Sequence, residues 1–179
     1  MSTYTRDDQK LRDQRMSFYN KSLIELINKL LQMFLKRSQA KCALLIDKEG
    51  HPITSAGETQ TYELDTICTL LAGTFAATRE WAKLMGEDEF SVLFHQGKKD
   101  SIQVTLVGNR ALLSVIFDDR TQLGLVRLMS NEVAKKLSEL FDQESPNSGN
   151  EEVANFVGEG FSDTAKGLLD NLFGDETSS

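Results

Sequence analysis

The sequence predicts an α+β fold in which amphipathic helices are separated by hairpins of strands. Residues 90–128 contain three consecutive strand patterns that run directly into a helical pattern. Residues 42–55 contain a further hairpin, and a helical pattern precedes each of these two regions. The predicted order is therefore helix, strand, strand, helix, strand, strand, strand, helix.

The first helix and hairpin follow a polar extension over residues 1–15. Apolar side chains recur at spacings of three and four, as on one face of a helix, at Leu23, Ile24, Ile27, Leu30, Leu31, Phe34 and Leu35. A short apolar strand over residues 42–46, a turn over 47–50 and a strand over 51–55 form the hairpin. Pro52 predicts that the second of these strands lies at a sheet edge.

The three later strands are predicted at residues 90–95, 102–106 and 111–117. The middle one alternates apolar and polar residues, as expected of a strand with one buried face, and the third is apolar except for Ser114, which favours a central position. Asp118 and Asp119 are expected to end the third strand, and Thr121 is expected to cap a helix that ends near residue 141.

The middle helix, over residues 64–85, has two predicted sides. The core side comprises Ile67, Leu70, Leu71, Thr74, Thr78, Trp81 and Met85. The outer side comprises Asp65, Thr69, Ala72, Gly73, Ala76, Arg79, Glu80 and Lys83. Ala72, Gly73 and Ala76 form a low-relief strip at its centre, which fits either an ordinary solvent face or a surface that another backbone approaches closely.

Length and composition favour a single domain. A chain of 179 residues buries roughly 70% of its unfolded surface and needs no metal or disulfide to be stable. Cys42 and Cys68 are therefore expected to be free, semi-buried thiols in a reducing compartment. Neither a signal peptide nor a membrane-spanning segment is evident, which predicts a cytoplasmic, soluble protein.

The net charge of −7 is concentrated in the last part of the chain. Residues 142–179 contain nine acidic side chains and one basic one, whereas residues 1–141 contain 18 acidic and 19 basic ones. Because the body is almost neutral, no nucleic-acid surface is predicted, and the basic residues of the first helix fit a solvated face.

Residues that could carry catalysis, a cofactor or a metal are not evident. The chain contains no phosphate-binding Gly-x-x-x-x-Gly-Lys-Ser/Thr loop, and His51 and His95 have no carboxylate or cysteine at metal-ligand spacing. Asp118 and Asp119 fit helix capping better than cation binding. The sequence therefore predicts a partner-binding protein without a catalytic site, metal or cofactor of its own.

Three long stretches resemble the bacterial MglB branch of the Roadblock family. They are LLIDKEGHPITSAGETQ (44–60), LLAGTFAATREWAKLMGEDEF (70–90), and FHQGKKDSIQVTLVGNR with VIFDDRTQLGLVRL (94–128). The resemblance implies a three-layer α/β/α fold: a five-stranded antiparallel sheet with one helix on one face and two on the other. It also implies a homodimer in which the middle helices lie side by side on a sheet extended across the dimer.

The resemblance further implies that a Ras-like GTPase of the MglA type docks on this helical platform. The docking face would comprise Thr69, Ala72, Gly73, Ala76, Arg79, Glu80 and Lys83. The implied activity is GTPase activation in a cell-polarity or motility switch, by reshaping the switch regions of the GTPase. Arg79 keeps an arginine supplied in trans as an alternative. Arg79, Glu80 and Trp81 also stand where MglB proteins often continue small residues.

The predicted organisation comprises an extension (1–15), a Roadblock domain (16–142), a flexible linker (143–160) and an acidic tail (161–179). In the tail, Phe161, Leu168, Leu169, Leu172 and Phe173 have the spacing of an amphipathic helix. A solubilising tail is one interpretation, and the resemblance favours a second contact with the GTPase.

Two functions from different classes remain at this point. The first is a GTPase activator, concentrated at a cell pole and working with other polarity proteins. The second is a scaffold that binds a GTPase or polarity protein without stimulating hydrolysis. A small-molecule sensor of related fold is a weaker third, because no cluster of polar residues suggests a pocket.

Overall fold

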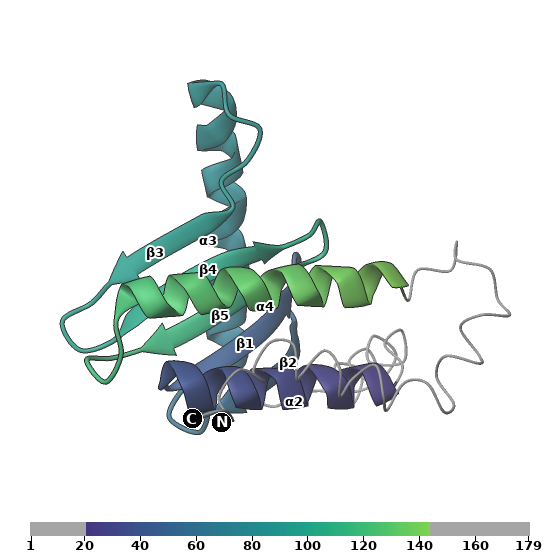
Figure 1. Cartoon of the computed structure of the whole chain (residues 1–179). Coiled ribbons are helices and arrows are strands. Elements are labelled where there is room, and N and C mark those ends of the chain that lie inside the picture. The colour runs from purple at the N-terminus through teal and green to yellow at the C-terminus, as the bar shows by residue number, and fades with distance from the viewer. Residues whose placement is uncertain (1–20, 144–179) are drawn as a thin grey trace, which may run out of the picture. The chain divides into compact units, whose positions relative to one another are not determined.

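A computed structural model describes residues 21–143, and the predicted segments 1–15 and 144–179 lie outside this range. The chain divides into two units, Met1–Ser138 and Glu139–Ser179, and the sheet and all helices but the last turn of α4 belong to the first. The elements are α2 (Lys21–Ser38), β1 (Cys42–Asp47), β2 (Pro52–Gly57), α3 (Leu64–Met85), β3 (Val92–Gln96), β4 (Ser101–Val107), β5 (Ala111–Phe117) and α4 (Leu123–Gln143) (Figure 1). Their order is the predicted one.

The five strands form one sheet in the order β2-β1-β5-β4-β3, and all neighbours are antiparallel. Every residue of β5 is buried, because this strand lies at the centre of the sheet with both faces covered. Pro52 opens the edge strand β2, as predicted, and β3 forms the opposite edge.

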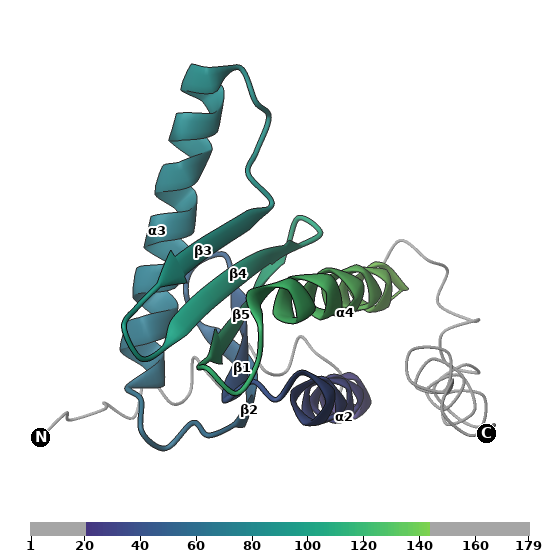
Figure 2. The same ribbon diagram turned by 60° about the vertical axis from the view of Figure 1, so that its left-hand side comes forward.

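Helices cover both faces of the sheet. Figure 2 shows α3 on one side and α2 and α4 on the other. Alternate residues of β1, among them Cys42 and Leu44, share one buried cluster with Phe75 of α3. On the opposite side, the backbone at Gly57 lies against the Leu35 side chain of α2. The three-layer arrangement follows from strands that are apolar on both faces.

The start of α4 differs from the prediction. The helix begins at Leu123, and the Thr121 hydroxyl oxygen is buried without a hydrogen-bond partner, so Thr121 is not the cap. Asp118 closes the preceding turn instead, because its carboxylate accepts hydrogen bonds from the Arg120 backbone N–H at 3.1 Å and from Nε at 2.9 Å. These bonds lower the pKa of Asp118. The helix ends at Gln143, two residues later than predicted.

Both cysteines are free, as predicted, but they are fully buried and not semi-buried. Burial raises the pKa of the Cys42 thiol to about 11 and that of the Cys68 thiol to about 12. Because the thiolate is the reactive form, both side chains act as small core residues at neutral pH. Within residues 21–143, no helix combines the length and the hydropathy needed to cross a bilayer.

Two glycines are expected to respond in opposite ways to alanine. Gly57 has φ +92°, and a Cβ there would lie 2.3 Å from the Lys41 carbonyl oxygen, so Gly57→Ala should lower the free energy of unfolding by about 2 kcal/mol or more. Gly73 lies within α3 with nothing within 4 Å of its Cβ position. Gly73→Ala should therefore raise the free energy of unfolding by up to about 1 kcal/mol. Urea denaturation at one protein concentration measures both, and equal responses would contradict the fold.

Candidate functional site: the exposed faces of helix α3

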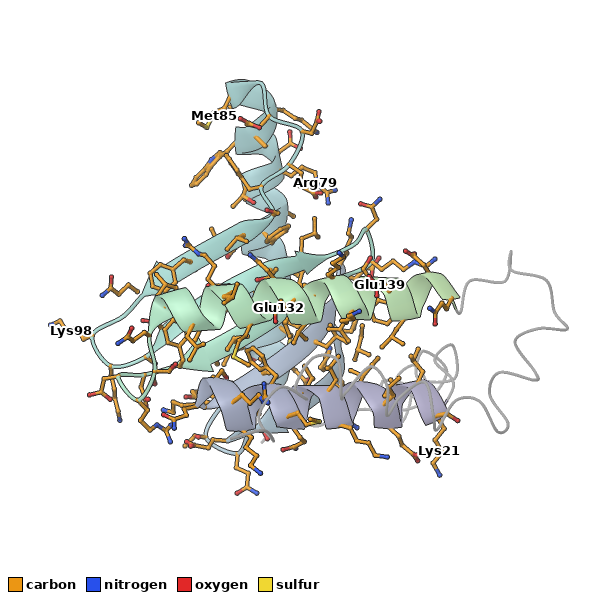
Figure 3. The ribbon with its side chains drawn as sticks, viewed as in Figure 1. Lys21, Arg79, Met85, Lys98, Glu132 and Glu139 are labelled. Atoms are coloured by element: carbon orange, nitrogen blue, oxygen red, sulfur yellow. The ribbon has the colours of Figure 1, made fainter. Side chains whose placement is uncertain are left out.

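Helix α3 extends beyond the sheet that it covers. In Figures 1 and 2 its C-terminal half continues past the edge strand β3, and Figure 3 shows Met85 at the far end. The helix ends at Gly86 in the left-handed conformation, and the Glu87 N–H donates to the Ala82 carbonyl at 2.9 Å. This capping turns the chain back toward β3.

The face of α3 that packs on the sheet differs from the predicted core side. The buried residues are Cys68, Leu71, Ala72, Phe75, Thr78 and Ala82. Leu70, Trp81 and Met85 were predicted to be in the core but are 64%, 62% and 71% exposed, and Thr74 is also exposed. Leu71 and Thr78 are buried as predicted, so the prediction failed only for the residues on the neighbouring exposed face. Small residues occupy part of the buried face, where the backbones come close: a Cβ at Gly50 would lie 2.8 Å from the Thr69 Cα.

Most of the predicted docking face is exposed. Thr69, Gly73, Ala76, Glu80 and Lys83 are exposed, whereas Arg79 is half-buried. Ala72 is only 5% exposed and belongs to the core, so its assignment to this face is wrong. Open space surrounds the Cβ position of Gly73, which gives the face its low relief. The small-residue face is defined as Thr69, Gly73, Ala76, Glu80 and Lys83.

The charged residues near this face are engaged in ion pairs. The Arg79 guanidinium lies 3.0 Å from the Glu89 carboxylate, in the segment that leads into β3. The Lys83 ammonium lies 2.8 Å from Glu80, three residues earlier on the helix. The first pair ties the returning segment to α3, and the second is an exposed surface pair.

A second exposed surface on α3 was missed by the sequence prediction. Residues 67, 70, 74, 77, 81 and 84 follow alternating spacings of three and four, which is the a/d pattern of helices that pack side by side. These residues, called the α3 seam, are Ile67, Leu70, Thr74, Ala77, Trp81 and Leu84. Leu84 is 87% exposed. Ile67 is half-buried against the core cluster and Thr74 is polar, but the other four residues are apolar and exposed. Exposed apolar residues in a row mark an interaction surface, and the spacing itself could have identified it.

The edge strand β3 offers backbone hydrogen-bonding groups next to this helix. The Ser91 carbonyl accepts from the Leu106 N–H at 2.9 Å, and the antiparallel register continues from this pair. By the alternation of such a ladder, the N–H and C=O groups of Val92, Phe94 and Gln96 point away from β4. They form an open edge to which another strand can bind.

The two histidines lie in different surroundings. His95 is exposed on β3. The turn after β1 brings ligand atoms of Asp47, Glu49 and His51 within 4.8 Å of one another, which the sequence spacing did not predict. His51 Nδ1 lies 3.1 Å from the Asp47 carboxylate. Hydrogen bonding within this exposed turn accounts for the cluster.

Comparison with known proteins agrees with this fold. The Roadblock/LC7 domain matches residues 26–117. Myxococcus xanthus MglB is 40% identical, with a TM-score of 0.68, and the match covers 73% of this chain and 98% of that one. The gliding protein MglB of Thermus thermophilus is 33% identical, with a TM-score of 0.65, over 70% of this chain and 94% of that one.

A further solved structure, described as MglB with tetrameric arrangement, is 32% identical with a TM-score of 0.65 and the same coverage of both chains, 70% and 94%. A sequence comparison with curated proteins finds no match. The match to the domain covers half of the chain, and three solved MglB structures exceed 30% identity over nearly their whole length. The chain therefore belongs to the Roadblock/LC7 domain family and, within it, to the MglB-like proteins.

Proposed function

We propose that this protein is a homodimeric activator of a Ras-like small GTPase of the MglA type, within a bacterial polarity or motility switch. Similarity to MglB, including a gliding protein, supports this system. The observation that carries the proposal is that α3 exposes two distinct surfaces, the small-residue face and the α3 seam. One is suited to the GTPase and the other to a second copy. The protein acts in the cytoplasm and gathers at a cell pole with other polarity proteins.

The open edge of β3 supports a homodimer. Two copies that pair through β3 in antiparallel fashion extend the sheet and bring their α3 helices side by side. Figure 2 shows that α3 continues past β3. In such a pair, this part of α3 would lie over the sheet of the second copy. A two-fold interface requires a self-complementary surface, and an antiparallel edge strand meets that requirement.

The α3 seam is also self-complementary. In an antiparallel pair of helices, a-type residues face d-type residues. The seam then places Leu70 against Trp81 of the second copy, and the smaller Thr74 against Ala77 of the second copy. Small residues at the centre let the helices approach closely, while larger ones bury apolar area at both ends.

The small-residue face lies beside this seam and remains open in the dimer. Gly73 and Ala76 present little more than backbone, so a loop or switch region of a GTPase can lie directly on the helix. Glu80 and Lys83 add charge at the rim, where polar contacts give specificity rather than affinity.

Activation by this face would act through the GTPase's own catalytic residues. Arg79 lies in an ion pair with Glu89 and is half-buried, which does not fit an arginine that reaches into another protein's active site. Binding on α3 would instead favour the ordered state of the switch regions. Because this ion pair holds Arg79 away from a catalytic role, it also favours a second candidate. That candidate is a scaffold that binds the GTPase without stimulating it.

Single-turnover hydrolysis of GTP by the purified GTPase separates the two candidates. An activator raises the rate constant when the protein is added in excess. If a complex forms and the rate stays at its intrinsic value, the protein is a scaffold. If no complex forms, both candidates fail.

The acidic tail is proposed to supply a second contact with the GTPase through Phe161, Leu168, Leu169, Leu172 and Phe173, which lie outside the described residues. Truncation after Gly149 should weaken the complex by roughly 10-fold or more, because a tethered second contact raises effective concentration. Titration calorimetry measures the affinity, and thermal unfolding should be unchanged. Equal affinities, or a large loss of thermal stability, would contradict this role.

A further inference from the structure

Charged segments of opposite sign flank the edge strand β3. Glu87, Asp88 and Glu89 precede the strand, and Lys98 and Lys99 follow it. Glu89 is paired with Arg79, which leaves two carboxylates at one end and two ammonium groups at the other. Glu87, Asp88, Lys98 and Lys99 are all exposed. Figure 3 shows Lys98 at the tip of the hairpin between β3 and β4, pointing away from the protein.

The ladder of β3 limits how the strand can pair with a second copy. Only Val92, Phe94 and Gln96 direct their N–H and C=O groups to the open edge. Two identical strands pair along their whole length when Phe94 faces Phe94 of the second copy and Val92 faces Gln96. The two-fold axis then passes between the two Phe94 residues.

This register brings the opposite charges together. β3 ends at Gln96, and the Gly97 N–H donates to the Asp100 carbonyl at 3.0 Å, so Lys98 and Lys99 form the tip of a tight turn at the end of the strand. Antiparallel pairing places this turn beside the segment that leads into β3 of the second copy, which carries Glu87 and Asp88. The two-fold axis repeats this arrangement at the other end of the paired strands. An arrangement in which the strands run parallel would instead place like charges together.

We propose that Lys98 and Lys99 of each copy form an electrostatic lock with Glu87 and Asp88 of the other, which fixes the antiparallel register of the β3 pair. This inference rests on the homodimer of the proposed function. β3 has only five residues, and its mixture of apolar and polar side chains would allow the two strands to slide past each other. The lock explains why the pair adopts one register. Complementary charges also oppose wrong registers through like-charge repulsion.

Charge-reversed chains test the lock by sedimentation equilibrium at low salt, about 50 mM, and at about 1 M. K98E/K99E and E87K/D88K should each dimerise about 10- to 100-fold more weakly than the unchanged protein at low salt, since several exposed pairs are replaced by repulsion. Mixing the two chains, one of them labelled, should restore a tight heterodimer. A chain with all four changes should restore the homodimer. The difference in dimerisation constant between the charge-reversed chains and the unchanged protein should be smaller at high salt.

The matched control K29E/K135E reverses two exposed lysines on α2 and α4, on the other side of the sheet, and should leave dimerisation unchanged. If the unchanged protein dimerises and the reversed chains do so equally well, or if mixing them restores nothing, the lock is wrong while the homodimer stands. If the unchanged protein is a monomer at all concentrations, the homodimer and the lock both fail.

Discussion

Ala76→Arg is expected to abolish binding of the GTPase while leaving the homodimer intact. Ala76 is exposed at the centre of the small-residue face, between Gly73 and Glu80. An arginine there would stand up from a surface of low relief and hold the GTPase away from the backbone of α3. Loss of close contact at the centre of an interface costs at least about 100-fold in affinity.

Titration of the GTPase, loaded with a non-hydrolysable GTP analogue, measures this affinity. Sedimentation of the variant alone should still show a dimer, and its thermal unfolding should match that of the unchanged protein, because the side chain points to solvent. An unchanged affinity would remove the small-residue face from the proposed function. Loss of the dimer would mean that this face is also part of the self-association surface.

Ala77→Glu is expected to have the opposite effect and to dissociate the homodimer. Ala77 belongs to the α3 seam, where the proposed pairing buries it against Thr74 of the second copy. Each dimer would bury two unpaired carboxylates close to its two-fold axis, and burying an unpaired charge costs several kcal/mol. Dimerisation should weaken by about 100-fold or more, as measured by sedimentation equilibrium.

Ala76→Glu is the matched control, because it places the same side chain one residue away on another face of the same helix. It should preserve the dimer and impair GTPase binding. If Ala76→Glu and Ala77→Glu weaken dimerisation equally, the division of α3 into two separate surfaces is wrong. If Ala77→Glu leaves dimerisation unchanged, the α3 seam is not the surface that joins the two copies.

The order and the approximate bounds of the elements could be predicted, because most elements have a clear period and β5 is an almost unbroken apolar run. The alternation around Ile102 and Val104 identified β4, and the apolar run from Ala111 identified the central strand β5. These patterns depend only on which face of each element is buried in its own chain.

The sides of α3 could not be predicted in the same way, because this helix has apolar residues on two faces. The prediction placed the large residues Leu70 and Trp81 in the core and the small Ala72 on the outer side, whereas the structure has the reverse. The sheet already supplies large side chains such as Leu44 and Ile116 at the contact, which leaves room only for small partners in places. Leu70 and Trp81 therefore remain exposed.

Contacts between distant residues also escaped prediction. Gly86 reverses the chain and brings Glu89 back to Arg79, ten residues earlier, so the arginine that was an alternative catalytic residue lies in an ion pair. A turn gathers Asp47, Glu49 and His51 in the same way. Such contacts depend on the path of the backbone, which periodicity does not describe.

Single-turnover GTP hydrolysis tests the central claim most directly, with the MglA-type GTPase and this protein in excess. The rate constant should rise by at least about 10-fold with the unchanged protein, and this increase should disappear with Ala76→Arg. Arg79→Ala should retain most of the stimulation, because Arg79 holds Glu89 rather than a nucleotide. A complex that forms with the unchanged protein but leaves hydrolysis at its intrinsic rate would contradict the proposed activity.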